Sequence, residues 1–207
     1  MPAMNDDDPR LYAPAATRNR QPIHEVLRSQ LPDRGLILEI ASGSGEHVVF
    51  LAERSAPELV FQPSDPDAAA RASIDAWARK SQLTNVRPAI ELDATSAVWP
   101  IGHADAVLCI NMIHIAPWEA TLGLMAGAAR ILPADGMLYL YGPFRRDGAN
   151  TAPSNAAFDM DLRNRNPAWG VRDLETVANV ADACGFAPPL VQNMPTNNLS
   201  VIFRRQQ

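Results

Sequence analysis

Two glycines near the start of the chain stand where a ligand-binding turn is expected. Gly43 and Gly45 form a G-x-G motif within LILEIASGSGEHVVFLAE, residues 36–53, between an apolar run and a stretch with helical spacing. The motif alone is weak evidence, because 11 glycines in 207 residues can produce it by chance. Its place after a predicted strand and before a predicted helix is typical of nucleotide-binding turns, in which glycine lets the backbone approach the ligand.

Four polar residues lie near the ends of successive predicted strands: Glu39, Asp65, Asp93 and Asn111. Neighbouring parallel strands present their carboxyl ends side by side, so we expect these side chains to line one crevice. Asp65 and Asp93 also have simpler explanations, since Asp65 can be a helix N-cap and Asp93 can merely end its strand. Glu39 lies inside an apolar strand, where a carboxylate needs hydrogen-bond partners. The backbone N–H groups of the glycine turn can supply them.

An alternation of apolar strands and amphipathic helices positions these residues. We predict helices over 20–31, 45–55, 66–82, 116–132 and 172–186, strands over 36–40, 58–65, 85–93, 103–115 and 135–144, and a closing pair of strands within 188–205. Pro22 suits the first turn of the first helix, and Asp173 suits the N-cap of the last. The pattern predicts an α/β fold with a mostly parallel sheet, helices on both faces and an antiparallel edge.

The domain organisation follows from the same pattern. We expect a flexible N-terminal arm over 1–18 and a single domain over 19–207, with a polar, irregular, lid-like insertion at about 145–170. The net charge of −5 argues against a nucleic-acid partner, which favours a basic face. Cys109 and Cys184 are not spaced like metal ligands, so we expect no metal and a reduced, cytoplasmic protein. We expect no signal peptide and no membrane span, and monomer and homodimer stay open.

The combination of LEIASGSG, Asp65, LDA and DAVLCINMIH resembles the class I S-adenosylmethionine-dependent methyltransferases. Seven further segments narrow the resemblance to the methyltransferase-like protein 26 family, whose bacterial members carry the label domain of unknown function 938. It covers about residues 10–205, through RNRQPIHEVL, LEIASGSGEH, QPSD, NMIHIAPW, LYGPF, SNAAFDMDLRNRNPAWGVRDLE and NNLSVIFRR. The resemblance implies a Rossmann-like seven-stranded sheet in the order 3-2-1-4-5-7-6, with strand seven antiparallel.

The resemblance also implies a role for each residue of the crevice. Gly43, Gly45 and the backbone of Ala41 and Ser42 would cradle the methionine part of S-adenosylmethionine, although the common pattern has glycine where Ala41 stands. The remaining cofactor contacts would be Asp65 with both ribose hydroxyls, Asp93 and Ala94 with the adenine, Asn111 with the carboxyl end or the methyl-transfer site, Glu39 beside the turn, and Asn19 and Arg20 capping the pocket.

A dinucleotide is the weaker alternative for this turn. A pyrophosphate needs a third glycine and a free helix N-terminus. Here Val48 takes the third position and Glu46 opens the helix with a negative charge. A cationic sulfonium suits an acidic pocket better, which favours S-adenosylmethionine over NAD(P) and a methyltransferase over an oxidoreductase.

Methyl transfer needs alignment more than it needs a catalytic triad, because the sulfonium already activates the methyl carbon. His114, three residues after Asn111, is our candidate general base, and the alternative is a histidine hydrogen-bonded in the core or at a cap. Asn111 is the second candidate for the transfer site. A non-catalytic cofactor-binding or interaction protein on the same fold is the main alternative function.

The insertion after Phe144 is the expected substrate lid. Asn155 and Asp159 are four residues apart and share a helical face with the apolar line of Phe158 and Leu162, a face that could meet the acceptor or simply pack down. The acceptor is expected to be a small molecule. Other candidate contacts, each with a core or turn alternative, are Trp118, Trp169, Tyr141, Phe144, Asn197 and Asn198.

Overall fold

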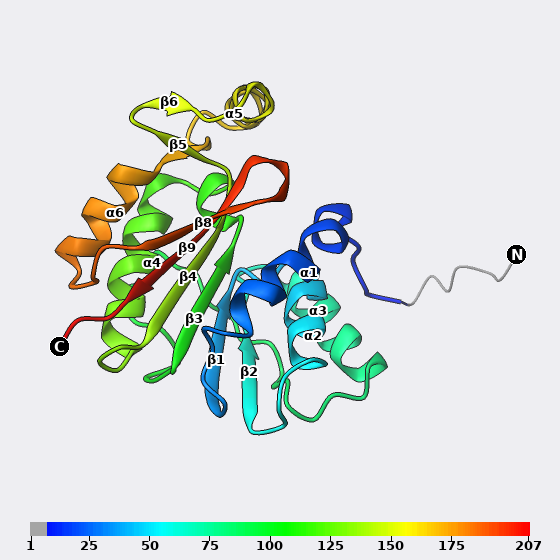
Figure 1. The fold of residues 1–207 in the computed structure, drawn as a ribbon. Helices are drawn as coiled ribbons and strands as arrows, with labels where there is room; N and C mark the ends of the chain where they lie inside the picture. The colour runs from blue at the N-terminus through cyan, green and yellow to red at the C-terminus, as the bar shows by residue number, and fades with distance from the viewer. Residues whose placement is uncertain (1–7) are drawn as a thin grey trace, which may run out of the picture.

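The computed structural model describes residues 8–207 and has one main sheet between two layers of helices (Figure 1). The sheet has six strands in the order β2-β1-β3-β4-β9-β8. The strands are β1 (Gly35–Ile40), β2 (Leu59–Pro63), β3 (Ala106–Ile110), β4 (Met137–Gly142), β8 (Leu190–Met194) and β9 (Asn198–Arg204). β1 to β4 pair in parallel, and β9 runs antiparallel to both β4 and β8. The predicted parallel sheet with an antiparallel closing pair is confirmed.

The predicted strand over 85–93 is reduced to isolated bridges. Val86 and Ile90 bridge in parallel to Phe61 and Ser64, so the segment lies outside β2, at the place of strand three in the order 3-2-1-4-5-7-6. Pro88 lies between the two bridges and has no N–H to donate to a ladder. The sheet therefore has six regular strands rather than the expected seven. The segment around Val86 and Ile90 lies at the outer edge, where the seventh strand is expected.

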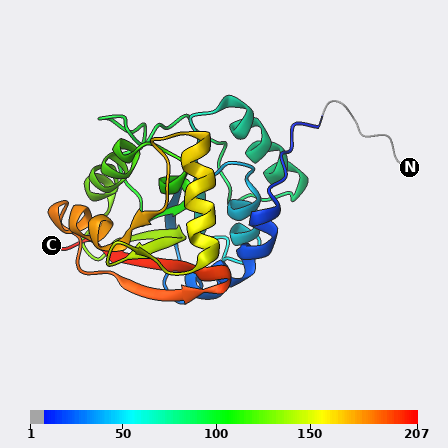
Figure 2. The same ribbon diagram turned by 90° about the horizontal axis from the view of Figure 1, so that it is seen from above.

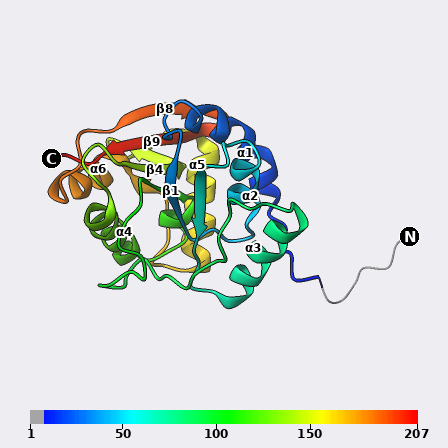
Figure 3. The ribbon, with the colours of Figure 1, turned by 90° about the horizontal axis from the view of Figure 1, so that it is seen from below.

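Both faces of the sheet are covered, as Figures 1 and 3 show. One face packs on α4 (Trp118–Ile131) and α6 (Leu174–Ala183), through a buried cluster that includes Leu124 and Val177. The other face packs on α1 (Pro14–Leu27), α2 (Glu46–Ala52) and α3 (Ala68–Lys80). Successive strand residues alternate between the two clusters: Leu38 belongs to the first and Ile37 to the second. The central strands β3 and β4 are apolar because both of their faces are buried.

The N-terminal helix begins earlier than predicted. α1 starts at Pro14, which takes the first-turn position assigned to Pro22, and Pro22 lies inside the helix. The predicted arm over 1–18 thus divides into three parts. Residues 1–7 lie outside the described residues, residues 8–13 lie beside α3 without regular secondary structure, and residues 14–18 are helical.

The insertion after Phe144 is more regular than predicted. It forms a small sheet, β6-β5-β7, from β5 (Phe144–Arg146), β6 (Ala149–Asn150) and β7 (Arg172–Asp173). It also forms the helix α5 (Pro153–Arg165), which Figure 2 shows lying across the top of the main sheet. Two short 3₁₀ helices complete the chain, η1 (Met112–His114) after β3 and η2 (Pro195–Asn197) between β8 and β9. Within residues 8–207, the helices are all too short or too polar to cross a membrane.

Candidate functional site

The turn between β1 and α2 has three residues in the left-handed backbone region. The φ angles are 53° at Ala41, 57° at Gly43 and 89° at Gly45. This region suits glycine, and an L-residue there costs about 1–2 kcal/mol. The common methyltransferase pattern has glycine at the position of Ala41, and the positive φ angle at this position explains that preference.

Gly43 and Gly45 have different surroundings. A Cβ on Gly45 would lie 2.7 Å from the Cα of Ile74, so the absence of a side chain lets the turn pack against α3. A Cβ on Gly43 would meet nothing within 4 Å. The turn therefore presents bare backbone to open space at Gly43, which is the kind of cradle that a ligand's polar end can enter.

Asp65, at the end of β2, holds this turn. Its Oδ2 accepts from the N–H of Gly43 at 3.0 Å, and its Oδ1 accepts from the N–H of Asp67 at 2.9 Å. The N-cap of α3 is Asp67, which accepts from Ala69, so the N-cap explanation of Asp65 is wrong. Each carboxylate oxygen has a second lone pair, so Asp65 retains the capacity to accept from hydroxyl groups of a ligand.

Glu39 is buried beside the turn, with 1% of its surface exposed. Burial raises the pKa of this carboxyl to about 8, against a smaller lowering by the Ser42 hydroxyl. Its Oε2 has no hydrogen-bond partner within the part of the chain that the structure describes. We expected N–H groups of the glycine turn to serve Glu39, but that of Gly43 goes to Asp65. A protonated carboxyl with one free oxygen here fits a site that a polar ligand group completes.

The side chain of Asn19 on α1 contacts α2 and β4, whereas that of Arg20 packs elsewhere. The side chain of Asn19 bonds His47 of α2, with 2.8 Å between Oδ1 and Nε2, and it also faces the hydroxyl of Tyr141. Burial lowers the pKa of His47 to about 4, so its ring is neutral at pH 7. The guanidinium of Arg20 stacks on Phe50, 4.8 Å from the ring centroid.

Asp93 and Ala94 lie beyond the edge segment next to β2. The Oδ1 of Asp93 accepts from the N–H and the hydroxyl of Thr95, each at 2.8 Å, which closes a local turn. Ala94 is buried against α4. Asp93 also lines an open hollow of about 380 Å³, with Glu91, Leu92, Ser96, Val98 and Pro100.

Asn111 and His114 come together just after β3. Asn111 has a φ of 63°, which asparagine tolerates better than most residues. His114 is 1% exposed, and burial lowers its pKa to about 3. Its Nδ1 accepts from the N–H of Arg172 at 3.4 Å, and its ring meets Phe144 edge to face. A Cβ on Gly142 would lie 2.5 Å from His114 Nε2 and 3.4 Å from Asn111 Oδ1. These contacts favour the core explanation of His114 over the general base.

Of the predicted lid residues, Asn155 ties the insertion to the body, whereas Asp159 bonds within the insertion. Asn155 is buried and donates to Thr151 and to the carbonyl of Asn197. Asp159 accepts from the N–H of Val171 at 2.7 Å and from Arg163 at 2.9 Å. Both have structural partners. The expected apolar line is also divided, because Leu162 is fully buried while Phe158 is 40% exposed.

The aromatic candidates are mainly structural. Phe144 and Tyr141 are buried in the two core clusters. Asn198 donates to the Tyr141 hydroxyl at 3.1 Å and thereby joins β9 to β4. The half-buried Trp118 and Trp169 stack with Arg172 and Arg165.

Arg172 is a residue that sequence reasoning missed. It donates to the carbonyls of Ile113 and Ala116, which fastens the insertion to the segment after β3, and to the carbonyl of Ala168 within the insertion. No local motif marks it, because its partners are backbone atoms as many as 59 positions away in the chain.

The architecture is shared with solved methyltransferases. An O-methyltransferase family protein from Burkholderia thailandensis matches with a TM-score of 0.79 and 21% identity, over 93% of this chain and 58% of that one. The S-adenosylmethionine-dependent methyltransferase SibL matches at 0.73 and 22%, over 90% and 55%. CalO1, a methyltransferase in calicheamicin biosynthesis solved with S-adenosylhomocysteine (SAH) bound, matches at 0.73 and 17%, over 92% and 55%.

These matches, at 17–22% identity, define the fold of this chain as the class I methyltransferase fold. The chain spans a little over half the length of each of these three proteins. Over residues 10–205 it also matches the family described as Protein of unknown function (DUF938), and it belongs to that family.

Proposed function

We propose that this protein is an S-adenosylmethionine-dependent methyltransferase that acts on a small-molecule acceptor. The observation that carries the proposal is the turn at Gly43, which presents bare backbone to open space while Asp65 holds its N–H from the neighbouring strand. The names of the structural neighbours, which include an SAH-bound methyltransferase, support the same cofactor. We also propose that the protein belongs to the methyltransferase-like protein 26 branch and that it is cytoplasmic.

The residues present suit the cofactor in chemistry as well as in place. Asp65 offers acceptors for a ribose diol, and Glu39 offers a buried oxygen that still needs a partner. The hollow beside Asp93 is a candidate place for the adenine. When bound, S-adenosylmethionine supplies a methyl group that is already activated by the sulfonium. The chain's own task is to orient the acceptor and exclude water, for which α5 and the small sheet are suitably placed above the main sheet.

The proposal assigns no proton transfer to His114. A buried imidazole with a pKa of about 3 is a weak base at pH 7. Asn111 directly follows β3, and we assign it an orienting role.

Calorimetric titration with SAH tests the proposal. We expect Asp65→Ala to weaken binding by on the order of 10- to 150-fold, because a charged acceptor for two hydroxyls is worth about 1.5–3 kcal/mol. Asp67→Ala is the matched control, since it removes the N-cap of α3 two residues away and should leave the affinity unchanged. Absence of binding by the folded wild type would refute the proposal. Binding without methyl transfer to any acceptor in metabolite extracts would favour the non-catalytic alternative.

A further inference from the structure

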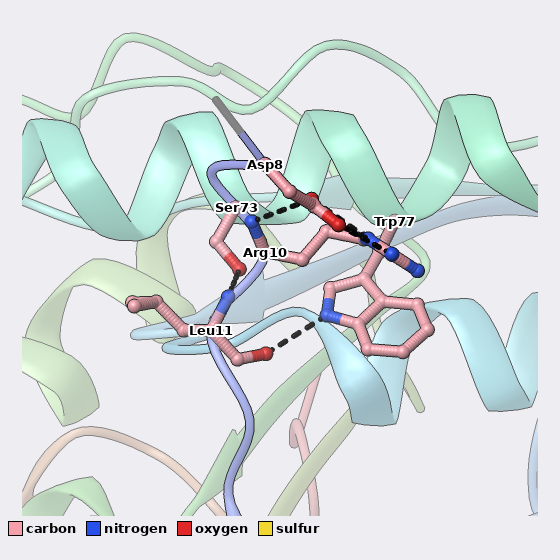
Figure 4. Close-up of polar contacts among 5 residues, drawn as sticks. All are labelled: Asp8, Arg10, Leu11, Ser73 and Trp77. Atoms are coloured by element: carbon pink, nitrogen blue, oxygen red, sulfur yellow. Dashed lines mark hydrogen bonds and ion pairs between the residues drawn. The ribbon is translucent and has the colours of Figure 1, made fainter. Parts of the chain in front are cut away.

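Residues 8–13 form a strap that is clamped along α3. The N–H of Leu11 donates to the Oγ of Ser73 at 2.8 Å, and the indole Nε1 of Trp77 donates to the carbonyl of Leu11 at 2.9 Å (Figure 4). Ser73 and Trp77 are four residues apart and therefore lie on one face of the helix. One residue of the strap thus has both of its backbone groups held by α3.

Side chains of the strap surround Trp77. The guanidinium of Arg10 lies 4.8 Å from the Trp77 ring centroid, and its Nε donates to Asp8 (Figure 4). Tyr12 meets the same indole edge to face, with 5.1 Å between ring centroids. Such contacts favour a docked strap, and each is worth roughly 0.5–1 kcal/mol at an exposed site.

The inner side of the strap reaches the glycine turn through two buried groups. The Oγ of Ser73, which accepts from Leu11, donates to the carbonyl of Ser44 at 2.7 Å. The Oε2 of Glu46 accepts from the N–H of Ala13 at 2.6 Å and from the hydroxyl of Ser44 at 3.0 Å. Ser44 lies between the two glycines of the turn. Its carbonyl and its hydroxyl are therefore each held by a side chain that also holds the strap.

Undocking the strap would change the environment of the turn. Ser73 would lose the donor to its Oγ, and Glu46 would lose a charge-assisted bond, both at buried positions. A buried acceptor without a donor is costly, and a hydroxyl that both accepts and donates strengthens both bonds. The position of Ser44, and with it the backbone at Gly43, therefore depends on whether the strap is docked.

We propose that residues 8–13 are a positioning strap for the cofactor turn, and that Ser73 and Glu46 are the positioning residues that transmit its docking. Strap docking and cofactor binding then stabilise each other by the same factor, as linkage requires. The inference rests on the proposed function only in taking an adenosyl cofactor as the ligand of the turn.

Trp77→Phe is the sharpest test, because Trp77 is clamped to the strap and makes no hydrogen bond to the turn. The substitution keeps an aromatic ring and removes the donor to Leu11. We expect SAH affinity, measured by calorimetry on the full chain, to fall about 2- to 5-fold, the equivalent of one net hydrogen bond. Ser73→Ala, which breaks both links, should lower it about 5- to 10-fold. Ser81→Ala is the matched control. Ser81 is the C-cap of α3, and its hydroxyl donates to Glu53 rather than to the strap or the turn.

Tryptic cleavage after Arg10 measures the reciprocal effect, that of SAH binding on strap docking. If the strap had only a structural role, SAH would not change the rate of this cleavage. SAH should slow this cleavage in the wild type, and the protection should be smaller in Trp77→Phe. Equal SAH affinity in the wild type, Trp77→Phe and Ser73→Ala, with no protection of the Arg10–Leu11 bond, would overturn the inference alone. Absence of SAH binding by the folded wild type would instead overturn the proposed function.

Discussion

Glu39→Gln should change how the stability of the protein depends on pH. Burial of the Glu39 carboxyl raises its pKa from an ordinary 4.5 to about 8 in the folded protein. Between these two values the folded state keeps a proton that the unfolded state has lost. The free energy of unfolding therefore falls as the pH rises from about 4.5 to 8, and glutamine, which does not titrate, removes this contribution.

The magnitude follows from the size of the shift. Each pH unit between the two pKa values costs the folded wild type about 1.4 kcal/mol, and because the slope is smaller near each pKa the total between pH 5 and pH 8 is roughly 3–4 kcal/mol. Urea unfolding of the wild type and Glu39→Gln at pH 5, 6, 7 and 8 measures the difference. We expect the two free energies to diverge with pH, in favour of the variant.

An exposed glutamate provides the control for this experiment. Glu91, whose side chain is 77% exposed, pairs with Arg71 on the surface, so Glu91→Gln should follow the wild type to within a fraction of a kcal/mol. Parallel pH profiles for the wild type and Glu39→Gln would refute the reasoning. They would show that the Glu39 carboxyl is solvated or fully paired in the folded protein.

Two backbone predictions test the geometry of the site. Gly142→Ala should destabilise the protein by roughly 1–3 kcal/mol in urea unfolding, because its Cβ would lie 2.5 Å from Nε2 of the buried His114; an unchanged midpoint would contradict the placement of the imidazole. Ala41→Gly should raise the free energy of unfolding by up to about 1 kcal/mol, since the φ of 53° favours glycine; a loss of stability would mean that the methyl group packs in a way that outweighs its strain.

The main sheet could be predicted from the sequence because most of its strands are short, mainly apolar runs bounded by turns. The exact extent of the edge strand could not, because Pro88 breaks the ladder without changing the apolar pattern around it. The start of α1 was misplaced for a related reason. Pro14 and Pro22 both suit a first helical turn, and only the packing of the helix on α2 distinguishes them.

The small sheet and the exact extent of α5 could not be predicted from the amino-acid composition of the insertion. Only Asn155 and Leu162 of α5 are buried, so most of its positions are polar and give little helical periodicity. The attachment of the insertion depends on Asn155 and Arg172, which bond backbone atoms distant in the chain. Such pairings have no signature in a single sequence.

The carboxylates around the turn show where sequence reasoning about the site stops. Strand-end positions correctly placed Asp65 beside the turn, and the apolar surroundings correctly marked Glu39 as buried. Which of the two takes the N–H of Gly43 depends on distances that only the folded chain sets. The structure gives that bond to Asp65, while burial raises the pKa of Glu39 to about 8, so two carboxyl groups that look equivalent in the sequence have different environments.

The electrostatics of the turn also bear on the choice between cofactors. Glu46 stands in the first turn of α2, where the partial positive charge of the helix N-terminus favours an anion. That carboxylate is already engaged with Ala13 and Ser44, so the protein supplies its own negative group at the place where a dinucleotide fold would receive a pyrophosphate. A pyrophosphate would have to approach against Glu46 and Asp65, whereas a sulfonium or an ammonium group is attracted by both. Glu46 therefore links the strap to the proposed function, because it holds Ala13 and, under that proposal, its carboxylate disfavours a phosphate at the turn.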